Sequence, residues 1–172
     1  SAKNRFGPTG ELGIFEMTSR GLEPISDPGE YFCGTSKQES GCMLTVSLEG
    51  TRPLLVEVQA LVSPGQYGSP QRSATGFSRR RLMMLIAVLE KKLGLPLGEQ
   101  DVFVNVTGGL SLDDPAVDLA IALSMISSYR DEPLPSRSIG IGEVGLTGRI
   151  RSPAQLERRL REAQRLDPGP IV

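Results

Sequence analysis

The amino-acid sequence predicts an α+β fold in which a sheet is layered with helices. Strand-like and helix-like segments follow one another in the order β, β, α, β, α, β, α, without an internal repeat. Residues 116–126 are apolar on almost every face, which indicates a central helix sandwiched between other elements. The chain has 172 residues, few aromatic residues and no tryptophan, so it can build one core that is mainly aliphatic.

The N-terminal sequence predicts a polar connector with a small hairpin. Two short extended runs, 13–17 and 22–25, are joined through Ser19-Arg20-Gly21, which is a hairpin pattern. We therefore predict a connector over residues 1–27 and a folded domain over residues 28–172.

Two strands are predicted next, over 42–48 and 52–62, with Glu49-Gly50-Thr51 as the tight turn between them. The second strand is long enough to run through the centre of a sheet. Residues 63–75 contain glycine, proline and small polar residues, and they predict a long loop.

Two helices flank a buried central strand at 102–106. Ser78 predicts the N-cap of the first helix, which ends before Gly94. Asp114 predicts the N-cap of the central helix, with Pro115 at the first helical position, where its missing N–H costs nothing.

The C-terminal part predicts a strand over 138–144 and a helix over about 155–166. That helix has apolar residues at helical spacing, including Leu156 and Leu160, and Ile171-Val172 suits the start of a further strand. The helix also carries four arginines: Arg158, Arg159, Arg161 and Arg165.

The composition excludes several kinds of catalytic site. The chain has no histidine, which removes Ser-His-Asp and Cys-His catalysis and the HExxH zinc site. A Ser-Lys dyad would need one of four lysines, among them Lys91 and Lys92. No Gly-Lys-Ser/Thr follows Gly108-Gly109, and two carboxylates occupy the place a phosphate would need, so a nucleotide site is not expected here.

The two cysteines, Cys33 and Cys42, lie nine positions apart, outside any tight metal spacing. We expect both to remain thiols, and the sequence gives them no role. No run of about eighteen apolar residues and no signal peptide occurs, so we expect a cytoplasmic protein that does not contact a membrane.

Charge is segregated along the chain. Residues 52–92 carry seven basic and two acidic residues, residues 93–136 one basic and seven acidic, and residues 137–165 seven basic and three acidic. The first turn of the helix after Ser78 holds three arginines, against the preference of the helix dipole for acids there. This pattern suggests a polyanion site, with a solvated charged face as the alternative. The candidate DNA contacts are Arg79, Arg80 and Arg81, then Arg52 and Arg72.

Two passages resemble the catalytic segments of Lon-type proteases. GGLSLDDPAVDLAIAL is similar to the part that carries the catalytic serine, and IGEVGLTGRIRSPAQLERRLREA to the part that carries the catalytic lysine. In this correspondence Ala116 falls on the serine and Glu157 on the lysine. The resemblance implies a Lon proteolytic-domain-like fold without its catalytic groups, and therefore no enzyme activity in this chain.

A second resemblance covers essentially the whole chain. The opening Lys3-Asn4-Arg5-Phe6-Gly7, followed by ELGIFEM, LEGTRPLLVEVQALVSP and DVFVNVTGG, resembles the bacterial RadA (Sms) family of DNA repair and recombination proteins. The resemblance implies the C-terminal Lon-like part of such a protein. The family's zinc finger and RecA-like ATPase, which bind zinc, ATP and Mg²⁺, would lie outside this chain, which itself needs no cofactor.

The function implied is a scaffold that assembles as a homo-oligomer, a hexameric ring, and supports DNA binding and branch migration of recombination intermediates. Other recombination or replication proteins are possible partners. Two alternatives stand beside it. One is a peptidase with a displaced dyad that pairs Lys91 or Lys92 with a loop serine. The other is a module that docks a protein partner through the former substrate groove.

Overall fold

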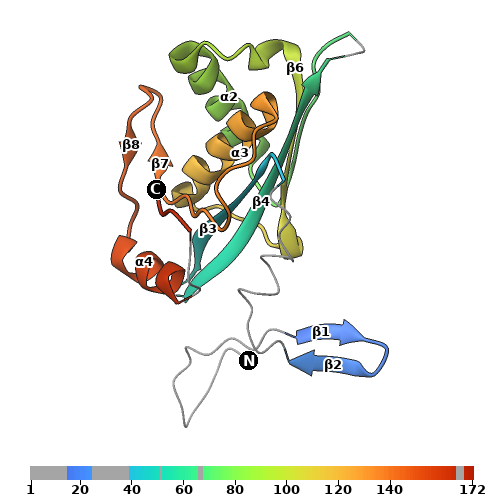
Figure 1. The fold of residues 1–172 in the computed structure, drawn as a ribbon, viewed down its shortest axis with the longest axis vertical. Helices are drawn as coiled ribbons and strands as arrows, with labels where there is room; N and C mark the ends of the chain where they lie inside the picture. The colour runs from blue at the N-terminus through green and yellow to red at the C-terminus, as the bar shows by residue number, and fades with distance from the viewer. Residues whose placement is uncertain (1–14, 25–38, 51, 66–67, 166–168) are drawn as a thin grey trace.

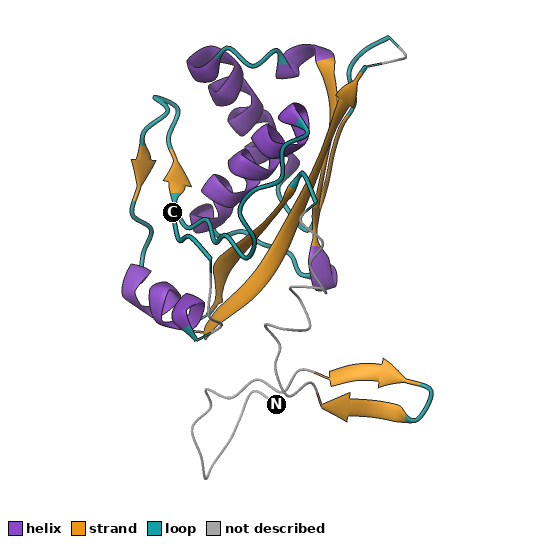
Figure 2. Cartoon of the chain, in the orientation of Figure 1, coloured by secondary structure: helices purple, strands orange, loops and turns teal. Residues whose placement is uncertain are grey.

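The predicted α+β class is confirmed in the computed structural model, in which helices pack on a four-stranded sheet (Figures 1 and 2). The structure describes all residues except 1–14, 25–38, 51, 66–67 and 166–168.

The sheet has the strand order β3-β4-β6-β5. Strands β3 (Cys42–Glu49), β4 (Arg52–Pro64) and β6 (Gln100–Val106) are antiparallel neighbours, and β5 (Arg72–Thr75) runs parallel to β6 at the edge. The prediction that the second long strand runs through the sheet centre is therefore confirmed.

One face of the sheet is covered by α2 (Arg79–Leu93) and α3 (Asp118–Arg130), and Figure 1 shows both helices on the same side. The main core lies between these helices and strands β4 and β6, and it is mainly aliphatic, as predicted. A second, smaller cluster forms where α4 (Leu156–Gln164) packs against β3 and β4. This cluster joins Leu44, Val46, Leu55, Ala116, Ile139, Ile141 and Ala163.

The predicted ends of α2 are confirmed. The Ser78 hydroxyl oxygen accepts a hydrogen bond from the Arg81 N–H at 3.4 Å. At the other end Gly94 is left-handed, with φ 69°, and its N–H donates to the Glu90 carbonyl. Glycine is favoured at this position because a side chain would strain that conformation.

The start of the central helix also agrees with the sequence. Thr107–Gly109 form a short 3-10 turn, and Pro115–Val117 form a second one that leads directly into α3. Most side chains of α3 are buried, because the helix contacts β3, β4, α2 and β7. The low polarity of residues 116–126 is thus explained by contacts on several sides.

Two predicted elements are wrong in part. Residues 63–75 are not one loop, since β4 continues to Pro64 and β5 begins at Arg72. The segment 138–144 is not one strand either: only β7 (Glu143–Val144) is regular, paired with β8 (Ile150–Arg151). The residues before β7 approach α3 so closely that a side chain on Gly140 would come within 3.0 Å of the Ala120 backbone.

The remaining elements lie at the ends of the chain. Strands β1 (Phe15–Thr18) and β2 (Gly21–Pro24) form the predicted hairpin, and the helix predicted near 155–166 is α4. The boundary predicted between residues 27 and 28, and the pentapeptide that starts at Lys3, lie outside the described residues. Among the helices that the structure describes, none has the length and apolar character needed to span a membrane.

Candidate functional site

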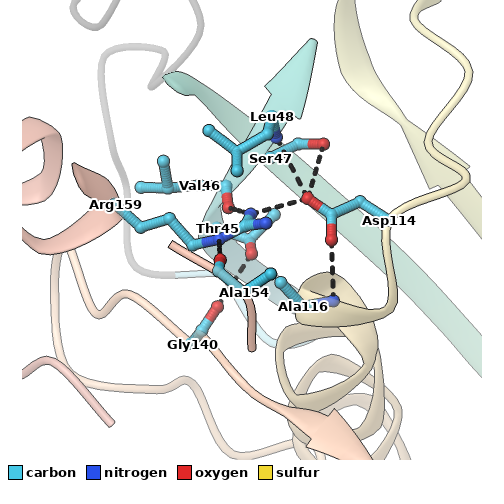
Figure 3. Close-up of polar contacts among 9 residues, drawn as sticks. All are labelled: Thr45, Val46, Ser47, Leu48, Asp114, Ala116, Gly140, Ala154 and Arg159. Atoms are coloured by element: carbon cyan, nitrogen blue, oxygen red, sulfur yellow. Dashed lines mark hydrogen bonds and ion pairs between the residues drawn. The ribbon is translucent and has the colours of Figure 1, made fainter. Parts of the chain in front are cut away.

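The N-terminal end of the central helix is held by Asp114. One carboxylate oxygen accepts from the Ala116 N–H at 3.1 Å, which is the predicted cap. The other oxygen accepts from the Leu48 N–H at 3.0 Å and, more weakly, from the Ser47 hydroxyl at 3.5 Å. Asp114 therefore joins the start of the helix to the end of β3, as Figure 3 shows.

A buried arginine from α4 completes this arrangement. Arg159 places Nη1 2.6 Å from Asp114 Oδ2 and 2.7 Å from the Val46 carbonyl, and Nε donates to the Ala154 carbonyl at 3.1 Å (Figure 3). Only 2% of the Arg159 side chain is exposed. The ion pair thus links α4 to both β3 and the central helix.

The protonation of Asp114 depends on these contacts. Burial by itself would raise the pKa of Asp114, but hydrogen bonds from Arg159 and from the Ala116 and Leu48 N–H groups outweigh it and hold the pKa below its usual value. The carboxylate is therefore charged at neutral pH and paired with Arg159.

Sequence reasoning missed the role of Arg159, which it grouped with the other arginines of the last helix. A signal was present: Arg159 lies three residues after Leu156 and four before Ala163, which places it on the apolar stripe of α4. The partner, Asp114, is 45 positions away in the chain and cannot be found from local spacing.

Ala116 and Glu157, the two positions that the Lon resemblance aligns with catalytic groups, differ sharply in environment. Ala116 is completely buried, whereas 88% of the Glu157 side chain is exposed, and Glu157 forms an ion pair with Arg161 at 3.5 Å. A buried methyl group and a solvated carboxylate thus stand where a Ser-Lys dyad would need a hydroxyl and an amine.

A second ion pair joins Asp118, the first residue of α3, to Arg81 of α2. Asp118 is fully buried, and Arg81 binds both of its carboxylate oxygens, through Nε and Nη2. The Val144 N–H also donates to Asp118 at 3.0 Å. The hydrogen bond to Asp118 raises the pKa of the Arg81 guanidinium above its usual value. Together these contacts join α2, α3 and β7.

The five arginines predicted to contact DNA therefore have different environments. Arg81 is bound to Asp118, and Arg72 donates to the backbone carbonyls of Gln100, Leu97 and Gly98. The structure gives both a role in holding the fold together. The other three have no ion pair among the described residues: Arg79 and Arg80 are exposed at the start of α2, and Arg52 is half-buried at the start of β4.

The described lysines, the described cysteine and the described acidic side chains do not form a recognisable catalytic dyad or metal site. Lys91 and Lys92 are exposed in the last turn of α2, and neither hydrogen-bonds a serine in the described part of the chain. Cys42 is a free thiol whose pKa is raised, mainly by burial, while Cys33 lies outside the described residues. No group of three acidic, cysteine or histidine side chains within the described residues could hold a metal ion.

Beside the Arg159–Asp114 pair lies a polar pocket of about 430 Å³. The end of β3 and the segment before the central helix form its walls, and Arg159 lines it from α4. Its lining includes Leu48, Glu49, Ser111, Asp113, Asp114 and Arg159.

Sequence comparison relates the chain to proteins named DNA repair protein RadA. It is 51% identical over 167 residues to the protein from Synechocystis sp., 50% identical to that from Bacillus subtilis and 45% identical to that from Streptococcus pneumoniae. These alignments cover 96% of the chain but only 33%, 36% and 40% of the three relatives, respectively. The chain thus spans about a third of the curated relatives it matches. No protein-family model matches it.

Proposed function

Because the chain is homologous over nearly its whole length to one part of the bacterial DNA repair protein RadA, we propose that it is a non-proteolytic module that supports DNA repair. The observation that carries this proposal is an identity of about half over 96% of the chain. We place the chain in the C-terminal region of those proteins because the sequence resemblance implies that position.

We further propose that the module has a Lon-like fold. In its support, the two passages that resemble the catalytic segments lie against each other: Asp114 stands two residues before Ala116, Arg159 two residues after Glu157, and the two side chains are in contact. An ion pair thus lies next to the positions where the proteases carry a serine and a lysine, and we assign it a structural role.

A displaced Ser-Lys dyad is not supported by the geometry. Such a dyad requires the hydroxyl and the amine to lie within hydrogen-bond reach. Lys91 and Lys92 extend from the exposed end of α2 without a serine partner among the described residues. We therefore favour a scaffold over a peptidase.

The surface that we propose for DNA begins at the N-terminus of α2. Arg79 and Arg80 are adjacent, exposed and without an ion pair in the described part of the chain, so both guanidinium groups can reach phosphates. Arg81, in the same turn, is bound to Asp118 and orients the helix. Arg79 and Arg80 would thus supply the positive charge, and Arg81 would hold the helix that carries them in position.

Removing this pair is expected to weaken DNA binding. Substitution of Arg79 and Arg80 by alanine should lower the affinity for a fluorescein-labelled duplex by about five- to tenfold at low salt. It should also reduce the slope of log affinity against log salt by about two, because two phosphate contacts are lost. Fluorescence anisotropy over a salt series measures both quantities.

A matched variant removes the same charge elsewhere. Arg161 on α4 and Arg165 at its C-cap are exposed, and each pairs with a nearby glutamate, so their double alanine variant should retain the original salt slope. Equal losses in both variants would show a diffuse charge effect and would remove Arg79 and Arg80 from the proposed site.

We also propose that the module assembles into a ring of six chains. Several large apolar side chains are exposed, including Leu61 (59%), Leu146 (73%) and Ile150 (59%), and burial between copies would stabilise an oligomer. Sedimentation velocity should give a mass near six times 18.5 kDa at micromolar concentration. Leu146→Glu combined with Ile150→Glu should shift that mass toward a single chain. A single-chain mass for the unaltered protein at all concentrations would rule out this assembly.

The activities of the longer proteins are the final part of the proposal. ATP, Mg²⁺ and zinc would bind to segments outside this chain, and the complete protein would promote branch migration together with recombination or replication proteins. The module would contribute assembly and phosphate contacts to that process. Its support is the homology, which covers about a third of each relative.

A further inference from the structure

The pocket beside the Arg159–Asp114 pair is lined by a buried arginine that has one nitrogen without a hydrogen bond to the described residues. Arg159 uses Nη1 and Nε for hydrogen bonds, but Nη2 has no partner in the described part of the chain, although the side chain is only 2% exposed. No fully buried side-chain nitrogen or oxygen among the described residues lacks a partner, so Nη2 must reach solvent. The pocket is the opening that Arg159 lines. Because Arg159 lines the pocket, Nη2 is the donor that its side chain can offer to a molecule bound there.

The rim of the pocket has the opposite character. Asp113 and Glu49 are exposed and form no ion pair within the described residues, and Asp114 is already occupied by Arg159. Ser111 is also exposed and its hydroxyl makes no hydrogen bond with a described residue. The pocket thus presents a deep cationic donor, a free hydroxyl and two unpaired carboxylates at its mouth.

We propose that this pocket binds an extended basic segment of a partner protein. A backbone carbonyl of the segment would accept from Arg159 Nη2, and its lysine or arginine side chain would pair with Asp113 and Glu49 at the rim. A nucleic acid does not fit, because its phosphates would face the same two carboxylates. The volume of about 430 Å³ accommodates one or two residues of such a segment. This inference does not depend on DNA binding by α2.

The fixed position of Arg159 favours such binding. Its guanidinium is held by the Val46 and Ala154 carbonyls and by Asp114, so little side-chain freedom is lost when a ligand binds. The end of β3, which forms another wall of the pocket, is also fixed, because the Leu48 N–H donates a hydrogen bond to Asp114. The pocket is therefore formed before a partner arrives.

The test uses two synthetic peptides and the ¹⁵N-labelled chain. The acetylated, amidated peptide Ala-Arg-Ala-Lys-Ala should produce saturable changes in the amide chemical shifts of Glu49, Ser111 and Asp113. The peptide Ala-Glu-Ala-Glu-Ala should produce none. Asp113→Asn combined with Glu49→Gln should weaken binding of the basic peptide about fivefold.

A control variant separates this site from general attraction by the acidic surface. Glu99→Gln combined with Glu132→Gln removes two exposed acids outside the pocket lining and should leave the affinity unchanged. Both double variants alter exposed residues, and an unchanged unfolding midpoint confirms that each is folded. The proposal is overturned if the basic peptide causes no shifts at the pocket, or if both double variants weaken binding equally.

Discussion

Replacing Arg159 with alanine is expected to lower the free energy of unfolding by about 3–5 kcal/mol, the usual cost of removing one partner from a buried ion pair. The substitution leaves the Asp114 carboxylate and the Val46 carbonyl without their charged donor. The site is buried, since only 2% of the Arg159 side chain is exposed. It also removes the hydrogen bond from α4 to the Val46 carbonyl of β3. Urea denaturation followed by circular dichroism measures the loss.

The loss of stability caused by Arg159→Ala should become smaller at low pH. The pKa of Asp114 in the folded chain lies below its ordinary value of 3.8, so the unfolded chain binds more protons near that pH. The stability contributed by the pair is therefore present above pH 3.8 and is lost as the pH falls through the lowered folded-state pKa. The difference between the unaltered chain and Arg159→Ala should narrow below pH 3.8.

A neighbouring arginine provides the control. Arg161→Ala removes an arginine from the same helix, but its pair with Glu157 has side chains that are 75% and 88% exposed. That variant should change stability by no more than about 0.5 kcal/mol. If Arg159→Ala were equally mild, the ion pair with Asp114 could not be what holds α4 to the sheet.

Replacing Arg81 with alanine is the second change with a large expected effect, again about 3–5 kcal/mol. The carboxylate of Asp118 is fully buried, and without Arg81 the Val144 N–H would be its only partner among the described residues. The reverse substitution, Asp118→Ala, should cost less. The Arg81 side chain is 28% exposed and can turn toward water when its partner is absent.

A double-mutant cycle tests this asymmetry. The Arg81→Ala/Asp118→Ala variant should be less destabilised than the sum of the single variants, because the isolated buried charge is gone. Arg80→Ala, one position earlier and exposed, serves as the control and should change stability little. Additive losses would show that Arg81 and Asp118 act independently and that the proposed coupling between α2 and α3 is absent.

Local signals allowed much of the fold to be predicted. Ser78, Gly94 and Asp114 fix helix ends through contacts within a few residues, so their sequence pattern was sufficient. The hairpin between β3 and β4 likewise joins neighbouring segments. In each case the interactions that define the element lie between residues close in the chain.

The features that escaped prediction depend on distant partners. Strand β5 is short and polar, and it is defined by pairing with β6 and by the bonds of Arg72 to carbonyls near residue 98. The candidate site escaped for the same reason: Arg159 and Asp114 meet only because α4 folds back over β3. The DNA role of Arg79 and Arg80 stays a prediction.

The outer edge of β3 is paired with the residues around Ile139, and this has a consequence for biosynthesis. Leu44 pairs with Ile139, and Ile139 in turn pairs with Ile171. On the ribosome, the backbone amides and carbonyls along that edge are made more than ninety positions before their partners, so they are open to wrong strand pairing while translation continues. Synthesis of the residues around Ile139 ends that exposure, so the closing of this edge is a late step in folding.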